Sequence, residues 1–243
     1  MIIGINGYIG SGKDTVGQMI IDQNRYWDDT LSIPRWFWND QPWEIKKFAG
    51  KLKQIATLLT GIPIKKFEDQ AFKKTYLGKE WSYSKPLLRG DMLQQYKHWE
   101  DVDMTVREFL QLLGTEAIRE GLHTNAWVNA LFADYKEKQD DLGPSGHTTY
   151  PTYSYPNWII TDTRFPNEAK VIKDRGGIIV RVERGFDDLK IGPHELRIQR
   201  DPSTLHSSET ALDDWKFDYV IDNSGSLEDL EEKVKELLNN IKN

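Results

Sequence analysis

The sequence contains no cysteine, no surplus of positive charge and no hydrophobic run long enough to cross a membrane. The lack of cysteine excludes a disulfide framework, a thiolate zinc site and a catalytic thiol, and it fits a reducing cytosol. Lys and Arg number 32 against 38 Asp and Glu, which gives a net charge of −6. Because polymeric nucleic acid is bound largely through Lys and Arg at its phosphates, this balance argues against DNA or RNA as a partner, although it is compatible with a small basic pocket.

Two further features are missing from the sequence. The N-terminal residues MIIGING show neither the basic n-region nor the apolar h-region of a secretory signal. The five histidines have no metal-ligand spacing, so we expect no zinc site. We therefore expect a cytoplasmic protein that has no membrane partner.

Aromatic residues are plentiful, with 9 Trp, 10 Tyr and 9 Phe among 243 residues, and they can supply a sizeable core. Short apolar segments alternate with segments of helical spacing, a pattern typical of parallel βαβ units and hence of an α/β layer fold. The predicted strands are 1–6, 44–49, 158–161, 177–182 and 218–221, and the predicted helices are 13–22, 52–59, 106–113, 125–138, 169–174 and 227–241.

Two helix starts carry capping patterns. Thr105 followed by Glu108 predicts a capping box before the helix at 106, and Ser226 is predicted to cap the C-terminal helix. The C-terminal helix is amphipathic, and its predicted inward residues are Leu227, Leu230, Val234, Leu237, Leu238 and Ile241.

Several segments lack a clear period. Residues 24–44 look irregular, residues 64–104 indicate an insertion of short helices and loops, and residues 139–157 indicate a long surface loop. Residues 184–208 are polar, and four arginines (Arg181, Arg184, Arg197 and Arg200) flank or lie within them. We expect this last segment to be either a lid that excludes water from bound phosphates or a solvated charged loop.

The strongest functional pattern is the run from Gly7 to Lys13, which fits G-x-x-x-x-G-K between an apolar strand and a helix. In such a loop the backbone N–H groups and the helix N-terminus form a site for phosphate, and the lysine adds a point charge. The alternative is a glycine-rich turn with a surface lysine. The residue after the lysine is Asp14, followed by Thr15, where Ser or Thr would normally bind Mg²⁺. Asp14 could hold Mg²⁺ through water or orient Lys13.

A second candidate is the end of the apolar strand at 158–161, where Asp162 and Arg164 follow. Ligands of open α/β sheets bind at the carboxyl ends of the strands. An aspartate at this position can lie near a metal, and an arginine can bind a phosphoryl group and spread its charge. The alternative is an aspartate that caps the helix after Pro166 and pairs with Arg164.

These segments, together with others, resemble the phage-type deoxynucleoside monophosphate kinases. The order and spacing of the motifs follow that family over most of residues 1–20 and 105–240. The matching pieces are Gly7 to Thr15, Val106-Arg107 followed by Gln111 to Thr115, Trp127-Val128, Asp162 to Arg164 with Glu168, His206 with Glu209, and Val220 to Glu228. The Lys-Asp-Thr version of the loop is the version this family has.

The resemblance implies an α/β P-loop NTPase-type three-layer fold with a parallel five-stranded sheet and a helical or irregular insertion at about 64–104. It implies transfer of the ATP γ-phosphate to a deoxynucleoside 5′-monophosphate with Mg²⁺. The ATP side would be Gly10, Ser11, Gly12, Lys13, Asp14, Thr15 and Asn223, and the metal would lie near Asp14 and Asp162. The acceptor side would be Lys74, Arg107, Gly114, Thr115, Trp127, Asp162, Arg164 and Glu168, with Lys13, Asp162 and Arg164 catalytic.

Each of these residues also has a plainer interpretation. Trp127 could bound a nucleobase or belong to a helix core, and Gly114-Thr115 could end a helix. Glu168 could be an exposed first-turn acid, and Arg107 could be a surface residue.

Other functions also stay open. One is a kinase of another small phosphorylated acceptor such as dephospho-coenzyme A, and another is a nucleotide-binding switch protein, for which we identify no water-positioning residue. We expect one domain over 1–243 and small-molecule nucleotides as partners, and the sequence leaves a homodimer open.

Overall fold

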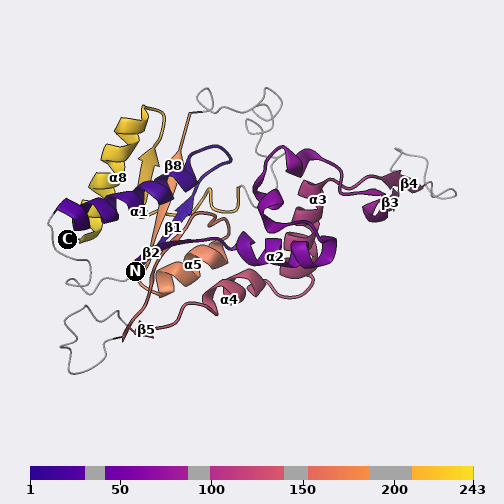
Figure 1. Ribbon diagram of the computed structural model, residues 1–243, viewed down its shortest axis with the longest axis horizontal. Coiled ribbons are helices and arrows are strands. Elements are labelled where there is room, and N and C mark those ends of the chain that lie inside the picture. Colours follow the sequence, from indigo (N-terminus) through magenta and orange to yellow (C-terminus); the bar gives the residue numbers. More distant parts are fainter. Residues whose placement is uncertain (31–41, 87–98, 140–152, 186–209, 243) are drawn as a thin grey trace. The chain divides into compact units, whose positions relative to one another are not determined.

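The computed structural model describes residues 1–30, 42–86, 99–139, 153–185 and 210–242 (Figure 1). The chain divides into two compact units. The first is Met1–Phe48 with Val128–Asn243, and the second is Ala49–Trp127. The insertion expected at 64–104 belongs to the second unit, and the single domain stays a prediction. Almost all of the expected lid at 184–208 lies outside the described residues.

The first unit is built on a five-stranded sheet in which every strand pair is parallel. Its order is β2-β7-β1-β8-β9, with the N-terminal strand in the centre. The strands are β1 (Ile2–Asn6), β2 (Trp43–Lys46), β7 (Asn157–Ile160), β8 (Ile178–Glu183) and β9 (Tyr219–Asp222). The α/β class and the parallel five-stranded sheet are therefore confirmed. The central strands β7, β1 and β8 are buried along nearly their whole length because helices cover both faces of the sheet, whereas the edge strands β2 and β9 are partly exposed.

Helices α1 (Lys13–Thr30) and α8 (Leu227–Lys242) lie side by side against one face of this sheet (Figure 1). Alternation along a strand explains the layering, since Ile3 and Ile5 of β1 point into the core with these helices. Gly4, between them, faces the other side of the sheet, where a Cβ on this residue would come within 2.7 Å of Ile172 Cδ1 in α5 (Pro166–Asp174). The result is the three-layer arrangement expected from the sequence.

The amphipathic C-terminal helix is confirmed with one exception. Its inward residues Leu230, Val234, Leu237 and Leu238 are buried in the same core, and Ile241 packs against it. Leu227 was expected to point inward but is 61% exposed. It is the first residue of the helix, and it is not part of the core that the other inward residues share.

The second unit contains α2 (Ala49–Thr60), α3 (Val106–Gln111) and a π-helix, η5 (Leu112–Glu120). Its core consists of Ala56, Phe67, Val106 and Phe109. The expected short helices in 64–104 are present as the 3-10 helices η2 (Ile64–Glu68), η3 (Phe72–Lys74) and η4 (Lys79–Trp81). The sequence pattern missed an antiparallel pair, β3 (Tyr83–Pro86) with β4 (Trp99–Val102).

Several predicted boundaries move. Helix α1 continues to Thr30, so the irregular segment predicted from residue 24 is wrong at its start. Helix α4 (Ala126–Phe132) ends well before the predicted residue 138, and β5 (Lys138–Gln139) follows it, paired with β6 (Tyr153–Ser154). The predicted capping box is present, because Thr105 Oγ1 accepts from the Glu108 N–H at 3.2 Å and Glu108 Oε2 accepts from the Thr105 N–H at 2.8 Å. Within the described residues, every helix is too short or too polar to span a lipid bilayer.

Candidate active site

The carboxyl ends of the parallel strands in the first unit carry most of the predicted catalytic and ATP-binding residues. Residues 7–12 join β1 to α1, the turn at 161–164 follows β7, and Asn223 follows β9. Since β7 and β1 are adjacent in the sheet, the loop and the turn lie next to each other at one sheet edge. This edge is where ligands of open α/β sheets bind.

Glycine is required in the loop for both conformation and space. Gly7, Gly10 and Gly12 have φ values of 153°, 81° and 97°, a region that other residues rarely adopt. A Cβ on Gly12 would come within 2.4 Å of Asn223 Nδ2, and a Cβ on Gly7 would come within 2.4 Å of the Val182 carbonyl oxygen. The loop backbone is therefore held close to β8 and to the end of β9.

Two groups in the loop suit a bound phosphate. Lys13 Nζ donates to the Gly7 carbonyl at 2.6 Å and to the Tyr8 carbonyl at 2.7 Å, so the ammonium lies over the loop. Ser11 Oγ is buried and has no hydrogen-bond partner among the described residues. A buried hydroxyl without a partner is costly, and a phosphate oxygen bound in the loop would supply one. The residues present therefore fit a bound polyphosphate.

Asp14 is held by two residues that the sequence patterns did not single out. Its Oδ1 accepts a hydrogen bond from Thr161 Oγ1 at 2.6 Å and pairs with Lys47 Nζ at 2.9 Å. Burial by itself raises the pKa of Asp14, but the Thr161 hydrogen bond and the Lys47 charge outweigh it, and the pKa is below its ordinary value. Thr161 and Lys47 each directly follow a parallel strand, and that position is the signal that could have identified them.

The turn after β7 is organised by Glu168 and by the backbone of Phe48. Glu168 is buried, and its Oε2 accepts from the Arg164 N–H at 2.8 Å and from the Phe165 N–H at 3.1 Å. Asp162 Oδ1 accepts from the Phe48 N–H at 2.8 Å. Glu168 is thus a first-turn acid of α5, as the plainer interpretation held, but it is buried and not exposed. Together these three hydrogen bonds restrain the chain at Arg164 and on both sides of it.

Asn223 contacts the phosphate-binding loop directly. It is 8% exposed, its Nδ2 donates to the Ser11 carbonyl at 2.8 Å, and its own N–H donates to the Glu183 carbonyl at 2.7 Å. Asn223 therefore ties the end of β9 to the centre of the loop.

The second unit brings together the segments of two predicted cations. The Val106 N–H donates to the Thr75 carbonyl at 3.0 Å, which places the backbone beside Arg107 next to the backbone beside Lys74. Arg107 is half-buried and one of its terminal nitrogens lies 3.3 Å from Gln70 Oε1, whereas Lys74 is exposed.

The other predicted residues of the second unit lie on or beside the π-helix η5. Gly114 and Thr115 are within it, and the Trp127 indole N–H donates to the Gly114 carbonyl at 2.7 Å. Trp127 is 6% exposed, which supports its interpretation as a core residue. Gly114 and Thr115 continue a helix and do not end one. Helical π segments often occur at functional sites.

The described residues contain no group of three or more His, Cys, Asp or Glu side chains that could hold a metal ion alone. Asp14, in the first turn of α1, and Asp162, in the turn after β7, nevertheless supply carboxylate oxygens at the same sheet edge, the donors that Mg²⁺ prefers. Mg²⁺ bound to nucleotide phosphates usually keeps several waters and takes only one or two carboxylates. The donor set therefore fits a Mg²⁺ ion that arrives with a bound nucleotide.

Comparison with known proteins gives a consistent result. The chain is 24% identical over 205 residues to the deoxynucleoside-5′-monophosphate kinase of Escherichia phage T5, over 72% of each chain. It is 27% identical over 134 residues to the deoxynucleotide monophosphate kinase of Enterobacteria phage T4, over 55% of this chain and 45% of that protein. A putative deoxynucleotide monophosphate kinase of Acanthamoeba polyphaga mimivirus is 26% identical over 210 residues, over 81% of this chain and 82% of that protein.

A solved structure of shikimate kinase from Bacteroides thetaiotaomicron matches the whole chain with a TM-score of 0.42 and 13% identity. The model of the deoxynucleotide monophosphate kinase family matches residues 88–234. That match spans more than half of the sequence and includes the turn after β7, so the chain belongs to the deoxynucleotide monophosphate kinase family.

Proposed function

We propose that this protein transfers the γ-phosphoryl group of ATP to a deoxynucleoside 5′-monophosphate. One observation carries the proposal. In a chain of this family, the glycine loop with Lys13 lies at the same sheet edge as the turn that holds Asp162 and Arg164. Phosphoryl transfer needs alignment and charge neutralisation more than a covalent group from the protein, and this edge supplies both.

The reaction balances without a further reactant. An oxygen of the acceptor's 5′-phosphate forms a bond to the γ-phosphorus of ATP. The bond from that phosphorus to the oxygen bridging the β- and γ-phosphates breaks, and its electron pair stays on ADP. The products are ADP and a deoxynucleoside diphosphate. Negative charge moves toward the leaving ADP oxygen, so cations beside the loop stabilise the transition state.

On the ATP side, we assign the phosphates to the loop residues Gly10, Ser11 and Gly12 and to Lys13. Lys13 would exchange its two loop carbonyls for phosphate oxygens, because an ammonium binds a charged oxygen more strongly than a neutral carbonyl. Thr15, in the first turn of α1, would lie near the α-phosphate. Asn223 would act through the Ser11 carbonyl that it already holds.

Mg²⁺ would be held near Asp14 and Asp162, in part through water, and would neutralise charge on the β- and γ-phosphates. Thr161 and Lys47 keep the Asp14 carboxylate ionised and oriented beside the loop. The Phe48 backbone N–H orients the Asp162 carboxylate through a hydrogen bond.

On the acceptor side, we assign Arg164 to the transferred group and its neighbouring phosphate, since a guanidinium can bind two phosphate oxygens at once. Lys74 and Arg107 are proposed to bind the acceptor phosphate, because their segments are hydrogen-bonded together. Gly114 and Thr115 would contact the nucleoside, and Trp127 would support them through the Gly114 carbonyl. Glu168 would position Arg164 and the turn before α5.

A coupled assay of ADP release tests the proposal. ATP and Mg²⁺ are supplied with dAMP, dGMP, dCMP, dTMP or dephospho-coenzyme A in turn, and turnover is expected with at least one deoxynucleotide. Turnover with dephospho-coenzyme A would instead support the alternative function, a kinase of another small phosphorylated acceptor. If no deoxynucleotide supports turnover above the rate without acceptor, the proposed function is wrong.

Two variants test the assigned roles. We expect Lys13→Ala and Arg164→Ala each to lower kcat about a hundredfold or more, because each removes a charge from the transition state. Lys170→Met is the matched control, since it removes a cation from an exposed pair with Asp174 on α5. Its kcat should equal that of the wild type. Near-normal turnover in either of the first two variants would remove the role assigned to that residue.

A further inference from the structure

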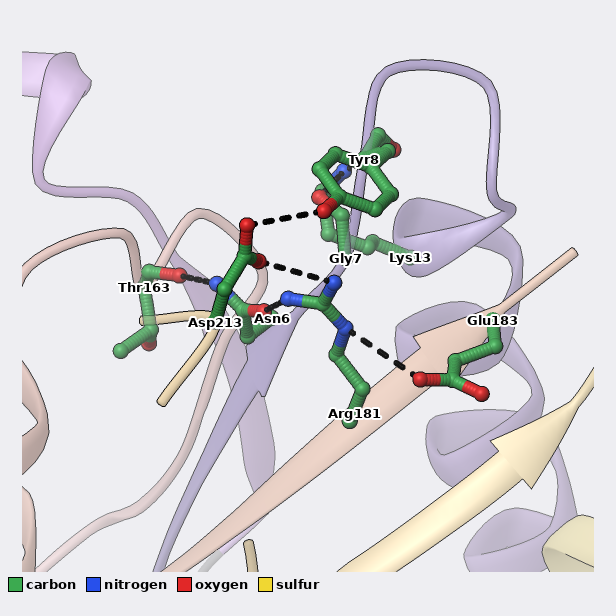
Figure 2. Close-up of polar contacts among 8 residues, drawn as sticks. All are labelled: Asn6, Gly7, Tyr8, Lys13, Thr163, Arg181, Glu183 and Asp213. Carbon is green, nitrogen blue, oxygen red and sulfur yellow. Dashed lines mark hydrogen bonds and ion pairs between the residues drawn. The ribbon is translucent and has the colours of Figure 1, made fainter. Parts of the chain in front are cut away.

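Arg181 is a buried cation next to the phosphate-binding loop, and the proposed chemistry does not use it. It lies on β8 opposite Asn6 of β1 in the parallel register, and it is 5% exposed. Burying a charge is costly unless partners compensate it, and Arg181 has several. The guanidinium donates to Asn6 Oδ1, lies 3.2 Å from Asp213 Oδ1 and lies 3.8 Å from Glu183 Oε1 (Figure 2).

Two aromatic rings complete the surroundings of the guanidinium. Its central carbon lies 4.6 Å from the centre of the Tyr8 ring and 5.5 Å from the centre of the Phe217 ring. A planar guanidinium with a fixed set of donors, enclosed by rings and acceptors, has little freedom to move. The Arg181 guanidinium is therefore held in one position between the end of β1 and the phosphate-binding loop.

From Arg181, one connection leads to the turn that carries Asp162 and Arg164. Asn6 accepts from Arg181 through Oδ1, and its Nδ2 donates to the Thr163 carbonyl at 2.8 Å (Figure 2). Thr163 lies between the two proposed catalytic residues in the chain. A shift of the guanidinium would therefore reach this turn through a single side chain.

A second connection leads to Lys13. Asp213 accepts from Arg181 on Oδ1 and from the Tyr8 hydroxyl on Oδ2 at 2.9 Å (Figure 2). Burial is the largest cause of a raised pKa of Tyr8, and the hydrogen bond to Asp213 is the next largest. The hydroxyl therefore stays protonated and acts as the donor. The Tyr8 carbonyl is in turn one of the two acceptors of Lys13 Nζ.

We propose that Arg181 is a positioning residue that couples the phosphate-binding loop to the Asp162–Arg164 turn, through Asp213 and Tyr8 on one side and through Asn6 on the other. It touches no reacting atom. It determines the spacing between the groups that hold ATP and the groups that stabilise the transferred phosphoryl group. The kinetic consequence rests on the proposed function, but the coupling itself does not.

The coupling is tested by amide hydrogen exchange on the full chain, followed by mass spectrometry. Arg181→Lys keeps the charge but loses the planar fork, and exchange is expected to rise about tenfold both in residues 7–13 and in residues 161–164. Tyr8→Phe removes only the bond to Asp213, so exchange should rise in residues 7–13 alone. Lys173→Met, which breaks the ion pair with Asp218 elsewhere in the same unit, should change neither segment.

An unchanged exchange rate in either segment of folded Arg181→Lys would overturn the proposal. If that variant does not fold, a double-mutant cycle of Tyr8→Phe with Asn6→Asp, which changes one residue on each side of Arg181, decides the matter. Each single variant is expected to lower kcat about tenfold while the KM for ATP changes less than threefold, and the double variant should be no slower than the slower single one. Additive losses would overturn the proposal. If the wild type shows no turnover, the proposed function fails, whereas the exchange result still decides the coupling.

Discussion

Thr161 donates its hydroxyl hydrogen to Asp14 Oδ1 over 2.6 Å, which joins the end of β7 to the first turn of α1. The two residues are 147 positions apart in the sequence. Thr161 is 1% exposed, whereas the Asp14 side chain is 69% exposed, so a buried hydroxyl orients a carboxylate that otherwise faces water. Asp14 occupies the position where phosphate-binding loops usually carry a Mg²⁺-binding hydroxyl, and this hydrogen bond orients its carboxylate there.

The Thr161 hydrogen bond predicts a kinetic effect. Thr161→Val keeps the shape of the side chain but removes the donor, so we expect kcat to fall about tenfold, the value of one hydrogen bond to a charged group. Thr161→Ser keeps the donor and should remain within about twofold of the wild type. Steady-state kinetics with ATP and a deoxynucleotide measure both. Equal rates for the two variants would show that the hydroxyl does not orient Asp14 for catalysis.

The buried position of Trp127 leads to a prediction about how the acceptor nucleotide is recognised. The indole N–H donates to the Gly114 carbonyl, and the ring is almost completely buried. Trp127→Phe keeps a ring but removes this hydrogen bond, so we expect the variant to lose about 0.5–1.5 kcal/mol of unfolding free energy. The KM for deoxynucleotides should rise by a similar factor for every accepted base. A change in the ranking of the four bases would instead indicate that the indole stacks on the base.

The lowered pKa of Asp222 predicts that the stability of the protein depends on pH. The Ser224 hydroxyl bonds to Asp222 Oδ1 at 2.6 Å, and this bond is the largest cause of a pKa below the ordinary value, aided by the Ser224 N–H and Lys233 and opposed by slight burial. A carboxyl with a lowered pKa contributes stability above its ordinary pKa, and that contribution is lost as the pH falls through the lowered value. Ser224→Ala should therefore be less stable than the wild type near neutral pH.

The difference between Ser224→Ala and the wild type should disappear in acid. Thermal unfolding from neutral to acidic pH measures this, and NMR titration of the Asp222 carboxyl should show its pKa moving up toward the ordinary value. Ser226→Ala is the matched control, because the Ser226 N–H and, to a smaller extent, its hydroxyl lower the pKa of Asp229. It should move the pKa of Asp229 and leave that of Asp222 unchanged.

Lys53 and Glu68 form an asymmetric ion pair that predicts unequal effects of removing its two partners. Lys53 Nζ lies 2.5 Å from Glu68 Oε1, and the side chains are 9% and 55% exposed. Glu68→Ala would leave a buried ammonium without its partner, and we expect a loss of about 1–3 kcal/mol in unfolding free energy. Lys53→Met keeps the buried stem and leaves a carboxylate that water can solvate, so its loss should be below about 1 kcal/mol.

Urea unfolding of both variants at the same pH measures the difference between them. If Lys53→Met proved the more destabilising of the two, the stability of the pair would come from the packing of the lysine and not from its buried charge.

The sequence predicted the strands of the main sheet well, because most of them are short apolar runs, and the three central ones are buried on both faces. Helix ends were less predictable. Helix α1 continues through residues that look irregular, and α4 ends early, because local propensity determines helix ends only weakly. The pair of β3 and β4 was missed, since a two-stranded exposed sheet needs no strict apolar alternation.

The residues of the candidate site likewise divide into those that the sequence identified and those that it did not. The glycines, Lys13 and Arg164 could be identified from the sequence because they belong to short continuous patterns. Lys47 and Thr161 have a weaker signal, their position directly after a strand, and only the order of the strands in the sheet decides that both meet Asp14.

What the sequence alone determined is local: an apolar strand, a glycine loop whose backbone can bind phosphate, and a helix that begins at Lys13. What only the tertiary structure decided is which distant side chains hold that loop in place. Asn223 reaches Ser11 across 212 positions, and Arg181 reaches Asn6 across 175. The physical reason is that parallel strands bring their carboxyl ends together at one edge of the sheet, whatever their separation along the chain.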